Sequence, residues 1–273
     1  MSSSLYNWLY RDTLSSRGRM ALLFGGAVVL VAAVVGGTWY YFHAKTVEKA
    51  EQERQAAAAL RQKRTNIHNF YTRALTGADA RGFLALYTEI LHSRQPIALA
   101  GFREDNFSCT TDTCSFSYQA GENTVFSVQD KWFRDVSYAP SFSQDSVDYT
   151  GIPSGMDTNP VLDAFNRQEK ISEPACNDIL NYVYSYNSLV DAGRRFTLTE
   201  LPASSVSADE ASLPGDQDNH GLLAGKWQVS LPDDYVSVFS FWQGRPYTSS
   251  FIFQSVAGKQ GNLDISGTFL CKK

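Results

Sequence analysis

The sequence predicts an α+β protein in which one N-terminal transmembrane helix continues into a helical stalk and then into a folded body. Three observations predict this class: an uncharged apolar run at residues 20–42, a helix-forming stretch without Gly or Pro at residues 44–75, and alternating apolar residues further on. The 273 residues are 19% charged, which excludes a mainly disordered chain. The part of the chain after residue 75 carries a net charge of −10, so nucleic acid is not expected as a partner.

The apolar run predicts a transmembrane helix at residues 20–43, after a cytoplasmic tail at residues 1–19. As a helix the run is about 34 Å long, which is enough for a hydrocarbon core of ~30 Å. It ends in Trp39, Tyr40 and Tyr41, and such rings are typical of a membrane interface. This length and this ending favour an uncleaved anchor over a signal peptide. Membrane lipid is then an expected partner.

Small residues repeat at intervals of four within this run. Ala32 precedes Gly36, and Ala33 precedes Gly37. This spacing lets a second helix approach closely, although Ala and Gly are also common in transmembrane helices that do not pair. Both interpretations stay open at this point.

The stalk at residues 44–76 has two interpretations. It is rich in Ala, Glu, Gln, Lys and Arg, which are strong helix formers. Its apolar residues recur every seven positions, as they do along the contact seam of a coiled coil. Glu53 and Arg64 fall on the same seam, however, so a short coiled coil and a solvated spacer helix are both compatible with the pattern. The seam residues are Leu60, Ile67, Tyr71 and Ala74.

The body contains two predicted α+β subdomains, residues 77–171 and 172–273. In each of them a helix precedes an antiparallel meander, as in a ferredoxin-like or related domain, and the repetition suggests an internal duplication. The predicted helices are 79–94, capped by Asp79 and ended by Pro96, and 174–192, with an apolar face of Ile179, Tyr182, Val183, Tyr186 and Leu189. The predicted strands are 107–109, 114–118, 124–128, 196–201, 227–231, 235–242, 251–256 and 263–271, of which 251–256 could instead be a short helix. Residues 130–171 and 202–225 are predicted to be mostly loop.

All four cysteines lie in the body. An even number of cysteines in a translocated domain predicts disulfides. Three pairings are possible, and we favour Cys109 with Cys114 and Cys176 with Cys271, because a short turn can place the first two opposite each other. The positive charges do not settle the orientation of the helix, whereas the cysteines place the body outside the cytoplasm.

No catalytic, cofactor-binding or metal-binding residues are predicted, and the chain is not expected to be an enzyme. The four histidines, His43, His68, His92 and His220, are scattered, and none of them has a metal-ligand partner at helical spacing. Cys109 and Cys114 lack the CxxC spacing of a redox pair.

Short motifs in the body carry a resemblance to a known family. Gly101-Phe102, Phe107-Ser108-Cys109 and Cys114-Ser115-Phe116 resemble the cysteine hairpin of PilO-like accessory proteins of type IVb pili, and residues 263–270 are similar to the closing strand of their ferredoxin-like domains. The layout of tail, span, stalk and α+β domain resembles that of the bitopic inner-membrane assembly-platform proteins of type IV pili and type II secretion systems.

The resemblance implies a non-enzymatic structural subunit of an envelope-spanning machine. Such a subunit lies in the bacterial inner membrane with a single pass, a cytoplasmic N-terminus and a periplasmic C-terminal domain. It links cytoplasmic motor components to the secretin. Its span and stalk pair with a homologous bitopic membrane protein, as a homodimer or heterodimer, beside other subunits of the pilus or secretion machine. Two other classes share the layout: an inner-membrane subunit of a type IV secretion system, and an anchored periplasmic sensor or enzyme.

Overall fold

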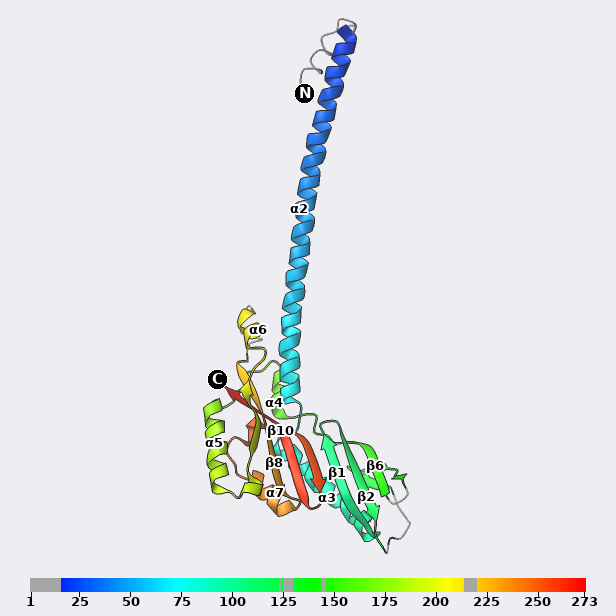
Figure 1. The fold of residues 1–273 in the computed structure, drawn as a ribbon, viewed down its shortest axis with the longest axis vertical. Helices are drawn as coiled ribbons and strands as arrows, with labels where there is room; N and C mark the ends of the chain where they lie inside the picture. Colours follow the sequence, from blue (N-terminus) through cyan, green and yellow to red (C-terminus); the bar gives the residue numbers. More distant parts are fainter. Residues whose placement is uncertain (1–15, 123, 125–129, 144–145, 214–219) are drawn as a thin grey trace, which may run out of the picture. The chain divides into compact units, whose positions relative to one another are not determined.

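The computed structural model describes residues 16–122, 124, 130–143, 146–213 and 220–273. It is an α+β structure with a long helix, α2 (Ser16–Leu75), and a large antiparallel sheet (Figure 1). The chain divides into two compact units, Met1–Gln62 and Lys63–Lys273. The first unit is helical wherever it is described, and the second contains the sheet, both hydrophobic cores and the last turns of α2.

Helix α2 runs for 60 residues and ends where the sequence predicts the end of the stalk. Thr76 and Gly77 follow it, and Gly77 has a φ of +152°. A Cβ atom at Gly77 would lie 2.5 Å from the carbonyl oxygen of Phe253. Any larger residue at this position would press its side chain against the backbone of Phe253, so glycine is needed here.

The predicted transmembrane helix needs correction. Among the described residues, no helix is both long and apolar enough to cross a membrane. The continuous apolar stretch with described side chains is Leu30–Phe42, about 20 Å of helix at ~1.5 Å per residue and shorter than a hydrocarbon core of ~30 Å. The polar residues His43 and Lys45 follow it. This finding contradicts the predicted single-pass topology and the predicted inner-membrane location, and residues 1–15 of the predicted tail lie outside the described residues.

One sheet of eight strands forms the centre of the second unit. Its order is β5-β6-β2-β1-β9-β10-β8-β7, and all neighbouring strands are antiparallel. The strands are β1 (Phe102–Thr110), β2 (Thr113–Ala120), β5 (Ser141–Phe142), β6 (Ser146–Pro153), β7 (Thr197–Ala203), β8 (Leu222–Pro232), β9 (Phe251–Lys259) and β10 (Asn262–Lys272). A separate hairpin consists of β3 (Lys131–Phe133) and β4 (Val136–Tyr138).

The two predicted subdomains share one sheet, and its element order differs from that of a ferredoxin-like domain. A ferredoxin-like domain follows the order β-α-β-β-α-β, with a helix after its first strand, whereas here β1 and β2 form a hairpin with no helix between them and belong to one antiparallel sheet of eight strands. Strand β1 from the first half of the body pairs with β9 from the second half, from Asn106 opposite Lys259 to Thr110 opposite Ser255. The two halves therefore share one sheet because their edge strands hydrogen-bond to each other.

Three helices pack with the larger hydrophobic core. They are α3 (Ala80–Leu99), α5 (Cys176–Leu189) and α7 (Tyr235–Trp242). Their buried faces follow helical spacing, as in Phe83, Leu86, Tyr87 and Ile90 of α3. Asp79 caps α3 as predicted, because its carboxylate accepts a hydrogen bond of 2.8 Å from the Gly82 amide.

A smaller core includes the last turns of α2 and α4 (Pro160–Asn166). Strand β10 supplies residues to both cores because its side chains alternate: Phe269 and Cys271 belong to the larger core, and Leu270 belongs to the smaller one. The last turns of α2 and α4 lie side by side in Figure 1. Helix α6 (Ser207–Ser212) contributes the buried Glu210 beside this core.

Several elements differ from their predictions. Residues 235–242 form helix α7 rather than a strand, and α3 continues through Pro96 to Leu99. Residues 130–171 contain four short strands and α4 instead of mostly loop. Residues 251–256 belong to a strand, β9. Leu189 is 85% exposed rather than buried. The predicted strand at residues 124–128 lies outside the described residues except for Thr124, and β6 pairs with β2.

Candidate functional site

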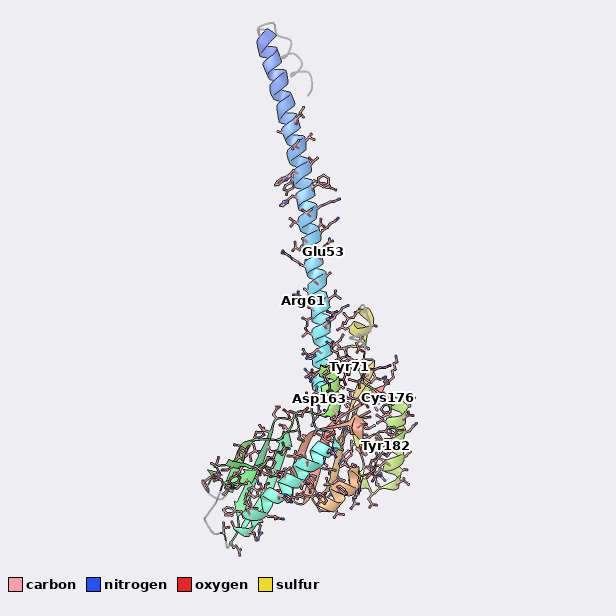
Figure 2. The ribbon with its side chains drawn as sticks, turned by 180° about the vertical axis from the view of Figure 1, so that it is seen from behind. Glu53, Arg61, Tyr71, Asp163, Cys176 and Tyr182 are labelled. Carbon is pink, nitrogen blue, oxygen red and sulfur yellow. A yellow bond between two sulfur atoms is a disulfide. The ribbon has the colours of Figure 1, made fainter. Side chains whose placement is uncertain are left out.

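The four cysteines form two disulfides, and the favoured pairing is confirmed. Cys109 bonds to Cys114 across the β1–β2 hairpin, where the two residues are direct ladder partners. Cys176, the first residue of α5 (Figure 2), bonds to Cys271 of β10. Because Cys109, Cys114 and Cys271 are also fully buried, the cysteines support the fold and offer no reactive thiol.

The residues predicted for helix pairing lie on an open helical surface. Ala32, Ala33, Gly36 and Gly37 are all exposed. A Cβ atom added at Gly36 or Gly37 would meet nothing within 4 Å. The backbone of α2 is therefore accessible at this point to a closely packed partner.

Large apolar side chains surround these small residues. We define the apolar segment as Leu30–Phe42 of α2. Its large side chains are between 56% and 72% exposed, and they are Leu30, Val31, Val34, Val35, Trp39, Tyr40, Tyr41 and Phe42. Single exposed apolar residues are ordinary, but a contiguous patch of this kind marks an interaction surface.

The predicted stalk seam divides at the boundary between the two units. Leu60 is 40% exposed. Ile67, Tyr71 and Ala74 are buried in the smaller core, together with residues of α4, β9 and β10. These three side chains thus pack against other parts of the same chain, and a second helix cannot contact them.

Two side chains of the sheet, Gln254 of β9 and Thr268 of β10, bind carbonyl groups at the C-terminal end of α2. The Gln254 amide donates to the carbonyls of Arg73 (3.0 Å) and Thr76 (2.8 Å), and the Thr268 hydroxyl donates to that of Ala74 (2.5 Å). The last carbonyls of a helix have no partner within the helix. These bonds satisfy them and hold the last turn of α2 against β9 and β10.

Asn159 completes this arrangement. Its side chain is 4% exposed. Its amide nitrogen donates to the carbonyls of Leu75 (2.6 Å) and Gly77 (2.9 Å), and its amide oxygen accepts from the backbone amides of Val161 and Leu162, both at 2.9 Å. Asn159 therefore caps the start of α4 and the end of α2 at the same time. The sequence offers Asn159-Pro160 as a helix start, but no local signal indicates its contact with α2.

A partly buried polar cluster joins α3 to β1 and to the turn after β8. Arg94 lies 2.8 Å from Glu104 and 2.9 Å from Asp233, and the Tyr87 hydroxyl donates to Asp233 at 2.7 Å. These side chains neutralise and hydrogen-bond one another, as buried charges require. Desolvation by burial raises the pKa of Glu104, and the Arg94 charge opposes this rise.

Lys131 adds a buried amine near this cluster. The residue is 2% exposed, and its Nζ donates to the Ser93 carbonyl (3.0 Å) and to the Tyr118 hydroxyl (2.8 Å). The amine also lies 4.2 Å from the centre of the Phe116 ring. Burial lowers the pKa of Lys131 to about 7, although the charge of Glu104 opposes the shift. Lys131 was not predicted as a buried residue, because a lysine beside Asp130 and Trp132 is normally expected on the surface.

The four histidines do not lie together in one cluster. His68 and His220 both lie near Phe165, whereas His43 and His92 lie elsewhere on α2 and α3. Within the described ranges, no group of three or more His, Cys, Asp or Glu side chains could hold a metal ion.

Comparisons with protein-family models, with curated proteins and with solved structures returned no match. The motifs of the β1–β2 hairpin and of β10 thus remain the basis of the family resemblance.

Proposed function

We propose that this protein is a non-enzymatic structural subunit that assembles with another subunit through the apolar segment of α2. The observation that carries the proposal is the exposure of this segment. Full burial of one Val, Leu or Phe side chain stabilises a structure by about 1.5–3 kcal/mol. Several such side chains together would offset the roughly 4–15 kcal/mol of freedom that is lost on association.

The partner in this proposal is a helix of a second copy or of a homologous subunit. Ala32 and Gly36 lie one turn apart on α2, and Ala33 and Gly37 do the same. They leave room for a second backbone between the large side chains. The seam residues within the second unit cannot supply this contact because Ile67, Tyr71 and Ala74 are buried in its smaller core.

The resemblance to PilO-like proteins supports a pilus or secretion machine as the assembly. The quoted motifs lie in elements that stabilise the second unit: Phe107 and Phe116 are buried ladder partners, and Cys109 and Cys114 form the disulfide beside them. The titratable side chains of the polar cluster around Arg94 bind one another, which suits a structural protein. We therefore propose a subunit of a type IV pilus or type II secretion machine.

Substitutions on α2 test the pairing. The double variant Ala32→Leu/Ala33→Leu should lower the fraction of cross-linked or sedimenting dimer of the full chain at least tenfold, because the added side chains prevent close approach. Ala57→Leu/Ala58→Leu is the matched control, since these residues are also exposed alanines of α2. A dimer fraction that is unchanged in the first variant, or equally reduced in the control, would contradict pairing through the small residues.

A gene deletion tests the machine. The deletion strain should lose pilus assembly or secretion, and the wild-type gene should restore it. Restoration by the Ala57→Leu/Ala58→Leu gene but not by the Ala32→Leu/Ala33→Leu gene would tie assembly to the apolar segment. Normal pili and normal secretion in the deletion strain would refute the assignment.

A further inference from the structure

A second seam, which we call the α2 seam, runs along the exposed part of α2. From Leu30 onward its residues recur in alternating steps of three and four, which is the spacing of the a and d positions of a coiled coil. The seam extends over about three and a half heptads, or ~36 Å of helix. It lies entirely in the first unit, and all of its residues are exposed. They are Leu30, Ala33, Gly37, Tyr40, Ala44, Val47, Glu51 and Arg54.

The α2 seam differs from the predicted stalk seam. The two share no residue, and the last three members of the stalk seam are buried in the smaller core. Beyond Arg54 the same spacing reaches Ala58, which offers only a methyl group. It then reaches Arg61, which already has an interaction partner in its own chain. The α2 seam therefore ends at Arg54.

Large and small side chains alternate along the apolar part of the α2 seam. In a parallel pair of helices in register, each seam residue faces its own copy. Tyr40 is 72% exposed, and its neighbours along the seam are Gly37 and Ala44. Two Tyr40 rings therefore have room at one level of the pair, because the levels before and after it carry almost no side chain.

Two charged residues of the seam indicate the partner. Glu51 and Arg54 occupy successive seam positions, and neither forms an ion pair with another described residue. In a parallel pair, Glu51 of one copy packs beside Arg54 of the other, and the two-fold axis generates the same contact a second time. A second copy of the chain thus supplies the complementary charges by symmetry, whereas any other partner would need the same two charges at the same spacing.

An antiparallel pair does not fit this seam. Setting Glu51 opposite Arg54 in an antiparallel pair would place residues 30–42 opposite residues 63–75. That part of α2 belongs to the second unit, and its residues Ile67, Tyr71 and Ala74 are buried in the smaller core. The apolar segment would then lose its apolar partner.

We propose that two copies of this chain pair in parallel and in register along the α2 seam, with Glu51 of each copy bonded to Arg54 of the other. The inference rests on the proposed assembly through the apolar segment, and it adds the identity, direction and register of the partner. Polar residues at seam positions fix the register of a coiled coil. A shift by one heptad would place the two charges beside Ala44 and Val47 of the other copy.

Engineered cysteines in the full chain test the direction. The four native cysteines are all in disulfides, so an added cysteine is the single thiol of the chain. Ala33→Cys and Ala44→Cys should each form a covalent dimer under mild oxidation, because both positions face their own copy in a parallel pair. Ala56→Cys is the matched control, since Ala56 is exposed on the outer side of the helix, and it should give at least fivefold less covalent dimer. An antiparallel pair brings at most one position opposite itself, so cross-linking at only one of the two seam positions would overturn the parallel direction.

Charge reversal tests the register. Glu51→Arg and Arg54→Glu should each lower the dimer fraction in sedimentation at least tenfold, because each variant sets like charges beside each other across the pair. An equal mixture of the two variants should recover the wild-type dimer fraction, since one chain then carries two positive charges and the other two negative charges. Glu53→Arg is the matched control. Glu53, labelled on α2 in Figure 2, lies about 200° around the helix from Glu51, so this variant should dimerise as the wild type does.

The outcomes separate this proposal from the proposed assembly. An unchanged dimer fraction in Glu51→Arg, with a loss in Ala32→Leu/Ala33→Leu, would overturn the α2 seam and leave pairing through the apolar segment intact. Equal losses in Glu51→Arg and Glu53→Arg would also overturn it. A wild-type chain that stays monomeric at every concentration would overturn the second copy as the partner and leave a homologous subunit in its place.

Discussion

Asn159 joins the end of α2 to the start of α4 through its side-chain hydrogen bonds. Replacing it with Ala removes the cap of α4 and leaves the buried carbonyls of Leu75 and Gly77 without their donor. Loss of a cap costs about 0.5–2 kcal/mol, and an unsatisfied buried polar group about 1–3 kcal/mol. Urea unfolding of Asn159→Ala should therefore show a loss of about 2–4 kcal/mol in the free energy of unfolding.

The matched control for this prediction is Asn177→Ala, because Asn177 is an exposed asparagine in the first turn of α5. Its substitution should change the free energy of unfolding by no more than about 0.5 kcal/mol. Equal losses in the two variants would show that Asn159 does not join α2 to α4 energetically.

Lys131 makes the stability depend on pH. Its pKa is about 7 in the folded chain, whereas an unfolded lysine has a pKa of about 10.4. Between these values the unfolded chain binds more protons than the folded chain, so the free energy of unfolding rises with pH. The contribution of this one group approaches ~1.4 kcal/mol per pH unit.

Urea unfolding of the wild type and of Lys131→Met between pH 7 and pH 10 would measure this contribution. Subtracting one curve from the other removes the contribution of the other titrating groups to the pH dependence. The described cysteines are all in disulfides, so they offer no thiol that could exchange at high pH. The wild type should gain stability relative to Lys131→Met as the pH rises. Parallel curves would mean that the amine of Lys131 is not desolvated.

Residue patterns predicted local contacts well and distant contacts poorly. Asp79 was recognisable as a cap, and Cys109 and Cys114 as a pair, because both interactions join residues close in sequence. The contacts of Gln254, Thr268 and Asn159 with the end of α2 join residues more than 80 positions apart. No local pattern specifies them. The contacts of His68 and His220 with Phe165 were missed for the same reason, since His220 comes close to the other two residues only in the folded chain.

At the scale of elements, the two disulfides should differ in their effect on stability. Cys176–Cys271 closes a separation of 95 residues and ties α5 to β10, whereas Cys109–Cys114 closes a separation of 5 within one hairpin. Cross-links that close longer loops restrict the unfolded chain more. We expect a loss of about 4–5 kcal/mol for Cys176→Ala/Cys271→Ala and of about 2 kcal/mol for Cys109→Ala/Cys114→Ala.

Urea midpoints of these two variants measure the difference, and each variant serves as the matched control for the other because both lose a buried pair. Equal losses would indicate that local strain or residual structure in the unfolded chain, and not loop length, decides the contribution of the disulfides.

Helix α7 shows how tertiary packing can override a local pattern. Residues 235–242 alternate apolar and polar side chains in part, which is typical of a strand. The same residues place Val238, Phe241 and Trp242 on one helical face, which the larger core buries. Asp234 also caps this helix by accepting a hydrogen bond from the Ser237 amide at 2.8 Å. In α3, burial of Ile97 similarly accompanies the continuation of the helix past Pro96, although proline cannot donate to the preceding turn.

At the scale of the whole molecule, the order of the sheet could not be predicted. Adjacent strands such as β1 and β2, or β9 and β10, pair as hairpins, and their turns are visible in the sequence. The pairing of β1 with β9 joins strands about 150 residues apart, and it depends on which sheet edges remain open after local pairing. The α+β class follows from composition and periodicity, whereas a single sheet in place of two follows from this distant pairing.

The two units should differ in resistance to proteolysis. Residues 43–62 of α2 are all exposed and include Lys45, Lys49, Arg54 and Arg61. A helix without packed side chains opens locally at low cost. In the second unit, Arg94 and Lys131 are held in buried contacts, and the carbonyl of Arg73 is bonded to Gln254. Brief trypsin treatment should therefore cut α2 at or before Arg61 sooner than it cuts the bonds after Arg73, Arg94 and Lys131.

The resistant fragment should begin at or before Gln62 and retain both disulfides, which mass spectrometry without reduction can verify. Its thermal unfolding should match the main transition of the intact chain, because both cores lie after residue 62.

Trypsin treatment of the Asn159→Ala variant adds a comparison, since weaker capping at Leu75 should expose the bond after Arg73. Early cleavage after Arg94 or Lys131 in the wild type would contradict an independently stable second unit. Protection of Lys45 and Lys49 that is lost in Ala32→Leu/Ala33→Leu would instead indicate that a paired helix shields this part of α2.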